Sequence, residues 1–110
     1  MFHGPVAVLL GPNTRNAGED VTVALHGRPH TRFFGAPTAG FPDWGVRVHR
    51  LADGTSLGIL ETRDADRTGQ VHRLPIDPDK PLPADAAPAA AIEQALEWLA
   101  DEAASASSAR

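Results

Sequence analysis

A polar turn between two apolar segments near the start of the chain contains its best candidates for chemistry. Residues 5–10 (PVAVLL) are typical of a central strand buried on both faces, residues 11–19 (GPNTRNAGE) form the turn, and a helical apolar pattern follows. A turn that leads into a helix leaves free backbone N–H groups at the helix N-terminus. Such groups suit a bound anion or a developing oxyanion.

Two side chains in this turn have both a structural and a functional interpretation. Asn16 and Glu19 have the spacing of an N-cap pair, which stabilises a helix start by about 1 kcal/mol. Alternatively, the Asn16 amide and the Ala17 N–H bind a carbonyl or carboxylate, and Glu19 acts as a general base. The residues themselves leave both interpretations open.

A loop rich in glycine and proline, residues 35–45, is the second candidate region. Its segment Phe41-Pro42-Asp43-Trp44 places an acid beside two aromatic side chains. This arrangement favours a small-molecule pocket in which Asp43 is the acid or base. The alternative is that Phe41 and Trp44 cover the sheet or form a contact between subunits.

Five histidines raise the question of a metal site. His26 and His30 are four residues apart, but Gly27 and Pro29 break any helix that would bring them onto one face. We therefore predict no metal site, and nothing in the sequence calls for a cofactor. His26 is expected to favour its charged form, because it lies at a helix C-terminus.

Two main helices and several short strands are expected to position these residues. The first helix covers residues 16–26 with Val21, Ala24 and Leu25 inward, and Gly27 ends it. The second covers residues 89–103 with an apolar stripe of Ile92, Ala95, Leu96 and Leu99. Strands are predicted at residues 5–10, 31–34, 46–51, 55–62 and 71–76, with a hairpin turn at Asp53-Gly54. The proline-rich segment 77–88 should run extended over the surface.

Composition narrows the class of protein. The 110 residues fit one domain, residues 1–103, followed by a disordered tail at residues 104–110. The net charge of −4 lacks the basic stripe that nucleic-acid binding needs, and no apolar run is long enough to span a membrane. Cysteine is absent, which excludes disulfides and sulfur-ligated zinc. Because the N-terminus does not resemble a signal peptide, we expect a cytoplasmic protein.

Six short motifs occur in one order along the chain. They are T-x-N-x-x-E at 14–19, G-R-x-x-T-R-x-x-G at 27–35, P-T-x-G at 37–40, D-G at 53–54, D-R-T-G at 66–69 and I-x-P-D at 76–79. In this order, between Gly4 and Leu99, they resemble the C-terminal half of the catalytic domain of the carboxyl-terminal processing (tail-specific) serine peptidases, which is similar to the crotonase superfold. The resemblance implies an α/β fold: a truncated half domain with a small mixed sheet and two main helices.

The same resemblance implies that peptidase chemistry is lost. Asn16 occupies the position of the attacking serine, and an amide cannot form an acyl-enzyme as a hydroxyl can. Phe41 occupies the position of the catalytic lysine of Ser-Lys members. The histidine base of other branches and one oxyanion amide come from an N-terminal half that we expect this chain to lack. The implied site keeps the Ala17 N–H as half of an oxyanion hole.

Two classes of function follow. The first is a non-proteolytic peptidase-like module that binds a peptide, a carboxylate ligand or a partner protein, with Thr14, Ala17, Thr38, Gly40, Phe41 and Trp44 as ligand-binding residues. The alternative is a small-molecule biosynthetic enzyme, a hydrolase, isomerase or cyclase, with Asp43, Glu19 or a histidine as proton shuttle. A half domain also leaves a sheet edge or face open, which favours a homo-oligomer or a partner that supplies the missing half.

Overall fold

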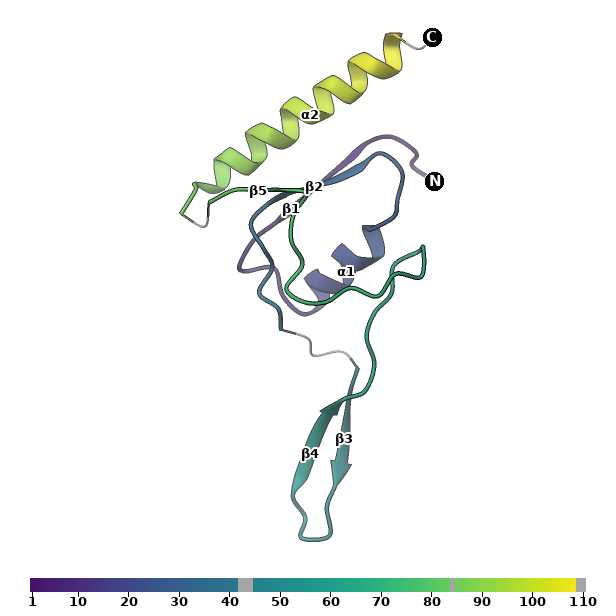
Figure 1. The fold of residues 1–110 in the computed structure, drawn as a ribbon, viewed down its shortest axis with the longest axis vertical. Helices are drawn as coiled ribbons and strands as arrows, with labels where there is room; N and C mark the ends of the chain where they lie inside the picture. The colour runs from purple at the N-terminus through teal and green to yellow at the C-terminus, as the bar shows by residue number, and fades with distance from the viewer. Residues whose placement is uncertain (42–44, 84, 109–110) are drawn as a thin grey trace.

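The protein, described by a computed structural model over residues 1–41, 45–83 and 85–108, has an α/β fold with two helices and a small sheet, as predicted. The elements follow one another as β1 (Val6–Leu10), α1 (Ala17–Leu25), β2 (Thr31–Gly35), β3 (Val46–Arg50), β4 (Ser56–Leu60), β5 (Lys80–Pro81) and α2 (Pro88–Ser108) (Figure 1). Strands β1, β2 and β5 form a parallel sheet, and β3 and β4 form a separate antiparallel hairpin.

The strand order β1-β2-β5 corrects two predictions. The central strand is β2, and β1, which was expected to be central, lies at the sheet edge and pairs with β2 alone among the described residues. The predicted strand at 71–76 reduces to an isolated bridge between Ala65 and Val71. The third strand is β5 instead, because Asp79 holds this segment against β2: its N–H donates to the Phe33 carbonyl (3.0 Å) and its carboxylate accepts from the Phe33 N–H (2.7 Å).

Helix α1 packs on one face of the sheet, but of the three residues predicted to face inward, only Leu25 packs against the core. The core on this side consists of Leu10, Val23, Phe33 and Ile76. Val21 and Ala24 are exposed, whereas Glu19, Thr22 and Val23 are buried. The rotation of the inward face has a polar cause: the Glu19 carboxylate bonds to a loop beneath the helix, which the pattern of apolar residues does not encode.

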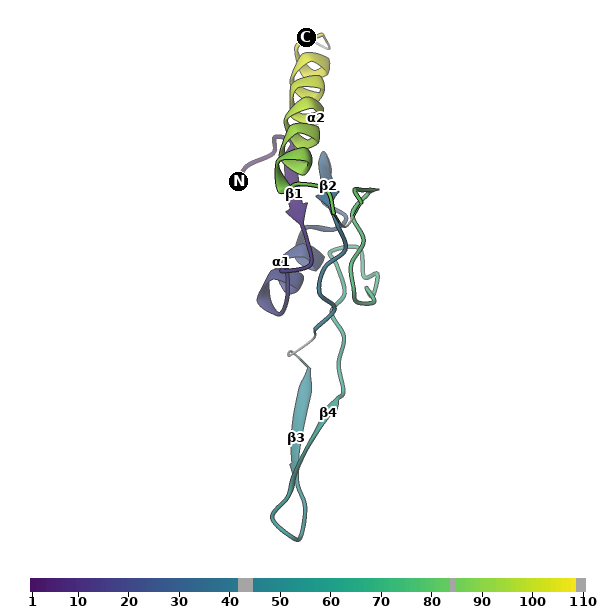
Figure 2. The same ribbon diagram turned by 90° about the vertical axis from the view of Figure 1, so that its left-hand side faces the viewer.

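Helix α2 covers the other face of the sheet, over β1 and β2 (Figure 2). Phe33 faces the α1 core, and the next residue, Phe34, faces α2, where its ring lies 5.8 Å from that of Trp98. Small residues, Ala91 and Ala95, contact the sheet.

The predicted apolar stripe of α2 is only partly inward. Ile92 and Leu96 are 47% and 60% exposed. The alanine face lets the helix approach the sheet closely and leaves these larger side chains on its flank. The helix also runs to Ser108, past the predicted end at Ala103. Residues 104–108, predicted to be disordered, are therefore helical; two of these five residues are alanine, which has the highest helix propensity.

The hairpin β3–β4 projects from the rest of the molecule (Figure 1). With the hairpin included, the molecule measures 67 × 33 × 18 Å. Its turn is the predicted Asp53-Gly54 pair: Gly54 has φ 86°, and the Asp53 carboxylate accepts from the Thr55 N–H at 2.8 Å. Among the described residues, no helix has the length and apolar character needed to cross a bilayer.

Candidate functional site

Asn16 lies at the predicted junction, immediately before α1, in an unusual backbone conformation. Its φ of 52° and ψ of −122° lie in a region that L-residues rarely adopt. An N-cap side chain normally bonds to the first helical turn from an extended backbone. The Asn16 side chain makes no such bond, so the predicted side-chain N-cap is wrong, and the positive φ is the physical reason. Such strained residues cluster at functional sites.

The turn before Asn16 is closed by its own hydrogen bonds. Thr14 Oγ1 accepts from the Gly11 N–H (3.1 Å), and the Gly11 carbonyl accepts from the Thr14 N–H (2.8 Å). At the helix start, the Asn16 carbonyl accepts from the N–H groups of Glu19 and Asp20. Within the described residues, no hydrogen bond uses the N–H of Ala17, which is exposed. The turn therefore presents a free amide beside Asn16.

Glu19 anchors the P-T-x-G loop. The side chain is fully buried, and its carboxylate accepts three hydrogen bonds: from Thr38 Oγ1 (2.5 Å), from the Gly40 N–H (2.8 Å) and from the Phe41 N–H (3.1 Å). Both carboxylate oxygens are engaged with the loop, and the side chain makes no bond to Asn16. The residue is therefore not the capping partner that the sequence suggested, and its role as a general base stays a prediction.

The P-T-x-G loop has two further attachments. Thr38 exchanges hydrogen bonds with Ile76: its N–H donates to the Ile76 carbonyl (3.0 Å), and its Oγ1 accepts from the Ile76 N–H (2.8 Å). The Ala39 N–H donates to the Thr14 carbonyl (2.8 Å). These bonds hold the loop against the turn that carries Asn16. Thr38 is 5% exposed, so it supports the site and does not line it.

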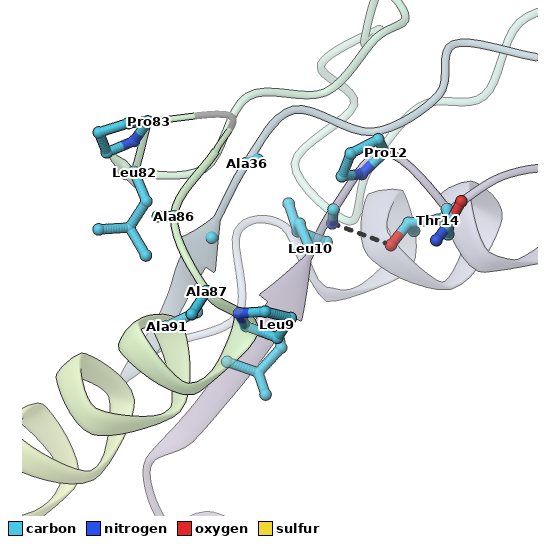
Figure 3. Close-up of a pocket in the computed structure, with 14 residues that line it drawn as sticks. Leu9, Leu10, Pro12, Thr14, Ala36, Leu82, Pro83, Ala86, Ala87 and Ala91 are labelled. Atoms are coloured by element: carbon cyan, nitrogen blue, oxygen red, sulfur yellow. Dashed lines mark hydrogen bonds between the residues drawn. The ribbon is translucent and has the colours of Figure 1, made fainter.

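A pocket of about 400 Å³ opens at the carboxyl ends of β1 and β2 (Figure 3). Thr14 lies in its wall, whereas Asn16 lies outside it. The other lining residues come from the end of β1 and its turn, the end of β2, and the segment that starts α2: Leu9, Leu10, Gly11, Pro12, Asn13, Gly35, Ala36, Leu82, Pro83, Ala86, Ala87, Pro88 and Ala91. Ligands of open α/β sheets bind at this end of the strands.

The predicted ligand-binding set is only partly assembled. Thr38 and Gly40 bond to Glu19, and Thr14 bonds to Ala39 of the same loop, whereas the Ala17 N–H takes no part in these bonds. Phe41 is bonded to Glu19 through its N–H, while its side chain is 62% exposed. Asp43 and Trp44 lie outside the described residues. The contribution of residues 82–83 and 86–88 and of Ala91 to the pocket was missed, because only the strand order shows that they return to the end of β1.

A second polar cluster was also missed. One carboxylate oxygen of Asp66 accepts hydrogen bonds from the Thr68 N–H (2.8 Å) and from the Thr68 hydroxyl (2.5 Å). The other carboxylate oxygen of Asp66 lies 2.7 Å from His72 Nε2. The His72 ring lies 4.4 Å from that of His26, which stacks on Phe33 at 4.1 Å. The D-R-T-G motif was the available signal, since Asp and Thr two residues apart are typical of such turns.

The electrostatics of this cluster correct the prediction for His26. Burial of the ring, and then the neighbouring His72, lower the pKa of His26 below its ordinary value. The neutral imidazole is therefore favoured, and the helix terminus does not outweigh these effects. The pKa of Asp66 is lowered as well, first by its hydrogen bond with His72 and then by those from Thr68. Within the described residues, no group of three His, Asp or Glu side chains is placed to bind a metal ion.

The chain is similar in sequence to the nisin-resistance protein of Lactococcus lactis subsp. lactis. The two are 36% identical over 76 residues, which make up 68% of this chain and 24% of that protein. The fold is similar to that of a lipoprotein from Streptococcus agalactiae, with a TM-score of 0.63 and 24% identity over 88% of this chain and 32% of the other. No family model matches the sequence. The chain thus spans about a quarter to a third of the length of these proteins.

These similarities correct the predicted location. A nisin-resistance protein and a lipoprotein point to a secreted or membrane-associated protein, and the expectation of a cytoplasmic protein is contradicted. The sequence-based expectation rested on the lack of a recognisable signal peptide near residue 1, which is weak evidence for a chain that matches only part of its relatives. The structural likeness establishes the α/β fold; the resemblance to tail-specific peptidases stays a prediction.

Proposed function

We propose that this protein is a non-proteolytic peptide-binding module that acts outside the cytoplasm, at the cell surface or in a secreted form. The observation that carries the proposal is the free Ala17 N–H beside Asn16, whose backbone is held in a strained conformation. In this proposal, the amide binds a carbonyl or carboxylate of the peptide. A neighbouring apolar side chain of the peptide enters the pocket behind Thr14.

The anchoring of the P-T-x-G loop supports a preformed site. Glu19 and Thr38 tie this loop to α1 and to Ile76 through buried hydrogen bonds, so the surroundings of Asn16 are fixed before a ligand arrives. A preformed site saves the ordering cost that weakens flexible binders. A role that needs geometry without covalent chemistry fits this arrangement, because Asn16 carries no nucleophile.

The sequence relative supports a peptide as the ligand class. It is named for resistance to nisin, which is a peptide. The part of that protein that this chain matches is only about a quarter of its length. We therefore propose peptide binding for this chain and not the full activity of its relative. We do not propose the small-molecule enzyme, because Glu19, one of its three proposed proton shuttles, is buried and hydrogen-bonded to the loop.

Titration calorimetry with nisin tests the proposal. We expect saturable binding with a dissociation constant in the micromolar range, and mass spectrometry of the mixture should recover nisin uncleaved. Asn16→Asp should weaken binding at least tenfold, because a carboxylate beside the Ala17 N–H repels a peptide carboxylate or carbonyl. Ala87→Trp should weaken it similarly, because the indole fills the pocket.

Gln70→Glu is the matched control for charge, since it adds the same negative charge at an exposed residue that does not line the pocket. It should bind as the wild type does. Equal affinity for all four proteins would show that nisin does not bind at Asn16 or in the pocket. Equal weakening by Asn16→Asp and Gln70→Glu would show a non-specific charge effect, and cleaved nisin would contradict the loss of proteolysis.

A further inference from the structure

Strand β1 has an open edge that lacks the usual protection against pairing. The Val6 N–H donates to the His30 carbonyl, and the Leu10 carbonyl accepts from the Ala36 N–H, so alternate residues of β1 bond toward β2. The main-chain groups of Ala7 and Leu9 therefore point away from the sheet. The strand sequence, VAVLL, contains none of the charges or prolines with which proteins block such edges.

The flank of α2 that overhangs this edge is free of charge. Trp98 contacts Phe34 of β2, so it marks the flank toward the middle of the sheet. At 100° per residue, Ile92 and Leu96 occupy the opposite flank, on the side of β1. Three exposed alanines continue this uncharged stripe along the helix: Ala89, Ala100 and Ala103. The acidic residues of α2 lie outside it: Glu93, Glu97, Asp101 and Glu102.

We propose that a second copy of this chain docks here, with the two β1 strands paired antiparallel about a twofold axis at Val8. Ala7 of each copy then lies opposite Leu9 of the other, and the two pairs exchange four main-chain hydrogen bonds. The two three-stranded sheets become one of six strands. Such an isologous contact is the commonest form of symmetric association.

The spacing of the helices favours a second copy as the occupant. Helix α2 contacts β1 and β2 to a similar extent, so its axis lies above the line between them. With neighbouring strands about 4.8 Å apart, the twofold axis places the two α2 axes about 10 Å apart on the same face of the sheet. Packed helices lie about 8–10 Å apart, so the two uncharged stripes meet at contact distance.

Along the direction of the strands, Leu96 of each copy lies at the position of the twofold axis, so the two Leu96 side chains lie close together. Helix α2 runs antiparallel to β1: Ala91 lies with Leu10 in the pocket wall, and Glu102 contacts His30 at 3.2 Å beside Val6. Leu96 is midway between these helix positions, and Val8 is midway along the strand. The two copies of α2, which are acidic on their other sides, therefore meet along their uncharged stripes.

The dimer would also extend the pocket. Antiparallel pairing places the amino end of one β1 beside the carboxyl end of the other. Residues that precede Val6 in the second copy therefore lie next to Leu10 and Gly11, at the mouth of the pocket. This consequence concerns the same pocket as the proposed function, but the dimer itself stands without any bound peptide.

Light scattering after size-exclusion chromatography tests the interface. At 50 μM we expect a mass twice the 11.6 kDa of one chain. Leu96→Glu should yield monomer, because it places two carboxylates at the axis. Ala7→Pro should do the same, because it removes an N–H on the open edge. The matched control Ala104→Glu adds the same charge to the acidic side of α2 and should remain a dimer.

Because the chain has no cysteine, a single introduced thiol gives an independent readout that does not depend on a destabilising substitution. Leu96→Cys should form a disulfide-linked dimer on mild oxidation, and Ala104→Cys should not. A monomeric wild type, with no cross-link through Cys at position 96, would overturn the proposal and leave the surface to a different chain. A dimer that survives Leu96→Glu would overturn it as well.

Discussion

Asn16 combines a position, a backbone conformation and a side chain that lead to different expectations. Asn16 lies at the start of α1 with a positive φ, as strained residues at functional sites often do, whereas the resemblance to tail-specific peptidases implies that its amide replaces the attacking hydroxyl. The neighbouring groups do not supply a base either. Glu19 accepts three hydrogen bonds, and Phe41 occupies the position that the resemblance gives to lysine.

Restoring the hydroxyl should therefore not restore proteolysis. Asn16→Ser is expected to remain unlabelled by a fluorophosphonate probe, since no described group is placed to deprotonate the serine. Intact-mass spectrometry after incubation with the probe measures this, with an active serine hydrolase as the positive control. A stoichiometric adduct on Asn16→Ser that is absent from the wild type would show that a base is present after all.

His26 illustrates how packing reverses a local electrostatic preference. Its ring lies between Phe33 and His72, and its Nε2 is buried with no hydrogen-bond partner in the described structure. Burial has the largest effect on the pKa of His26 and lowers it. Of the titratable groups nearby, His72 lowers this pKa, and Asp79 and Asp66 raise it. The folded state therefore binds this proton less tightly than the unfolded chain does.

Stability should accordingly fall as the pH drops below about 6.5, the ordinary histidine value. The unfolded chain takes up the proton first, so the loss is at most about 1.4 kcal/mol per pH unit for this one group. His26→Phe keeps the stacking and should remove most of the change in urea midpoint between pH 7.5 and pH 5.5. Asp66 does not contribute in this range, because its lowered pKa acts only below pH 4. An unchanged pH dependence in His26→Phe would assign the effect to another histidine.

Among the elements, α1 and the loop at residues 37–41 form one unit through Glu19. The carboxylate joins the helix to the loop, and Thr38 continues the connection to Ile76 in the core. A buried acid of this kind is costly without partners, so the three donors explain its presence. The same connection explains why α1 turns Val21 outward and Val23 inward.

Replacing Glu19 tests this coupling. Glu19→Ala leaves a buried hydroxyl and two N–H groups without an acceptor, and should lower the free energy of unfolding by about 2–4 kcal/mol. Glu19→Gln keeps one oxygen for Thr38 and Gly40 and should cost less, about 1–2 kcal/mol. Urea denaturation followed by circular dichroism gives both values. Val21→Ala, an exposed position on the same helix, is the control and should change stability by under 0.5 kcal/mol.

At the scale of the whole molecule, several elements expose apolar surface. The open edge of β1, the flank of α2 and the projecting hairpin all present apolar side chains. A two-stranded hairpin is marginally stable alone, and both Val48 and Leu60 on its apolar face are exposed. The similar proteins are three to four times longer than the part of them that this chain matches, so they contain further residues.

Local patterns in the sequence determined most elements of this fold. The strand at 5–10, the helix that follows Asn16, the Asp53-Gly54 hairpin and the C-terminal helix were all predictable, because each is encoded by the spacing of apolar residues and by turn residues within a few positions. The α/β class was implied by the family resemblance that the six motifs carry. Thr14, Ala17 and the P-T-x-G loop were also identified as neighbours, through the order of motifs.

Only the tertiary structure decided how these elements face one another. The place of β1 at the edge, the pairing of β5 with β2, the burial of Glu19 and the outward flank of α2 depend on contacts between residues far apart in the chain. Apolar periodicity shows that a helix has an inward face, but buried hydrogen bonds and the size of the contacting side chains set its rotation. The pocket exists because three such elements meet at one end of the sheet.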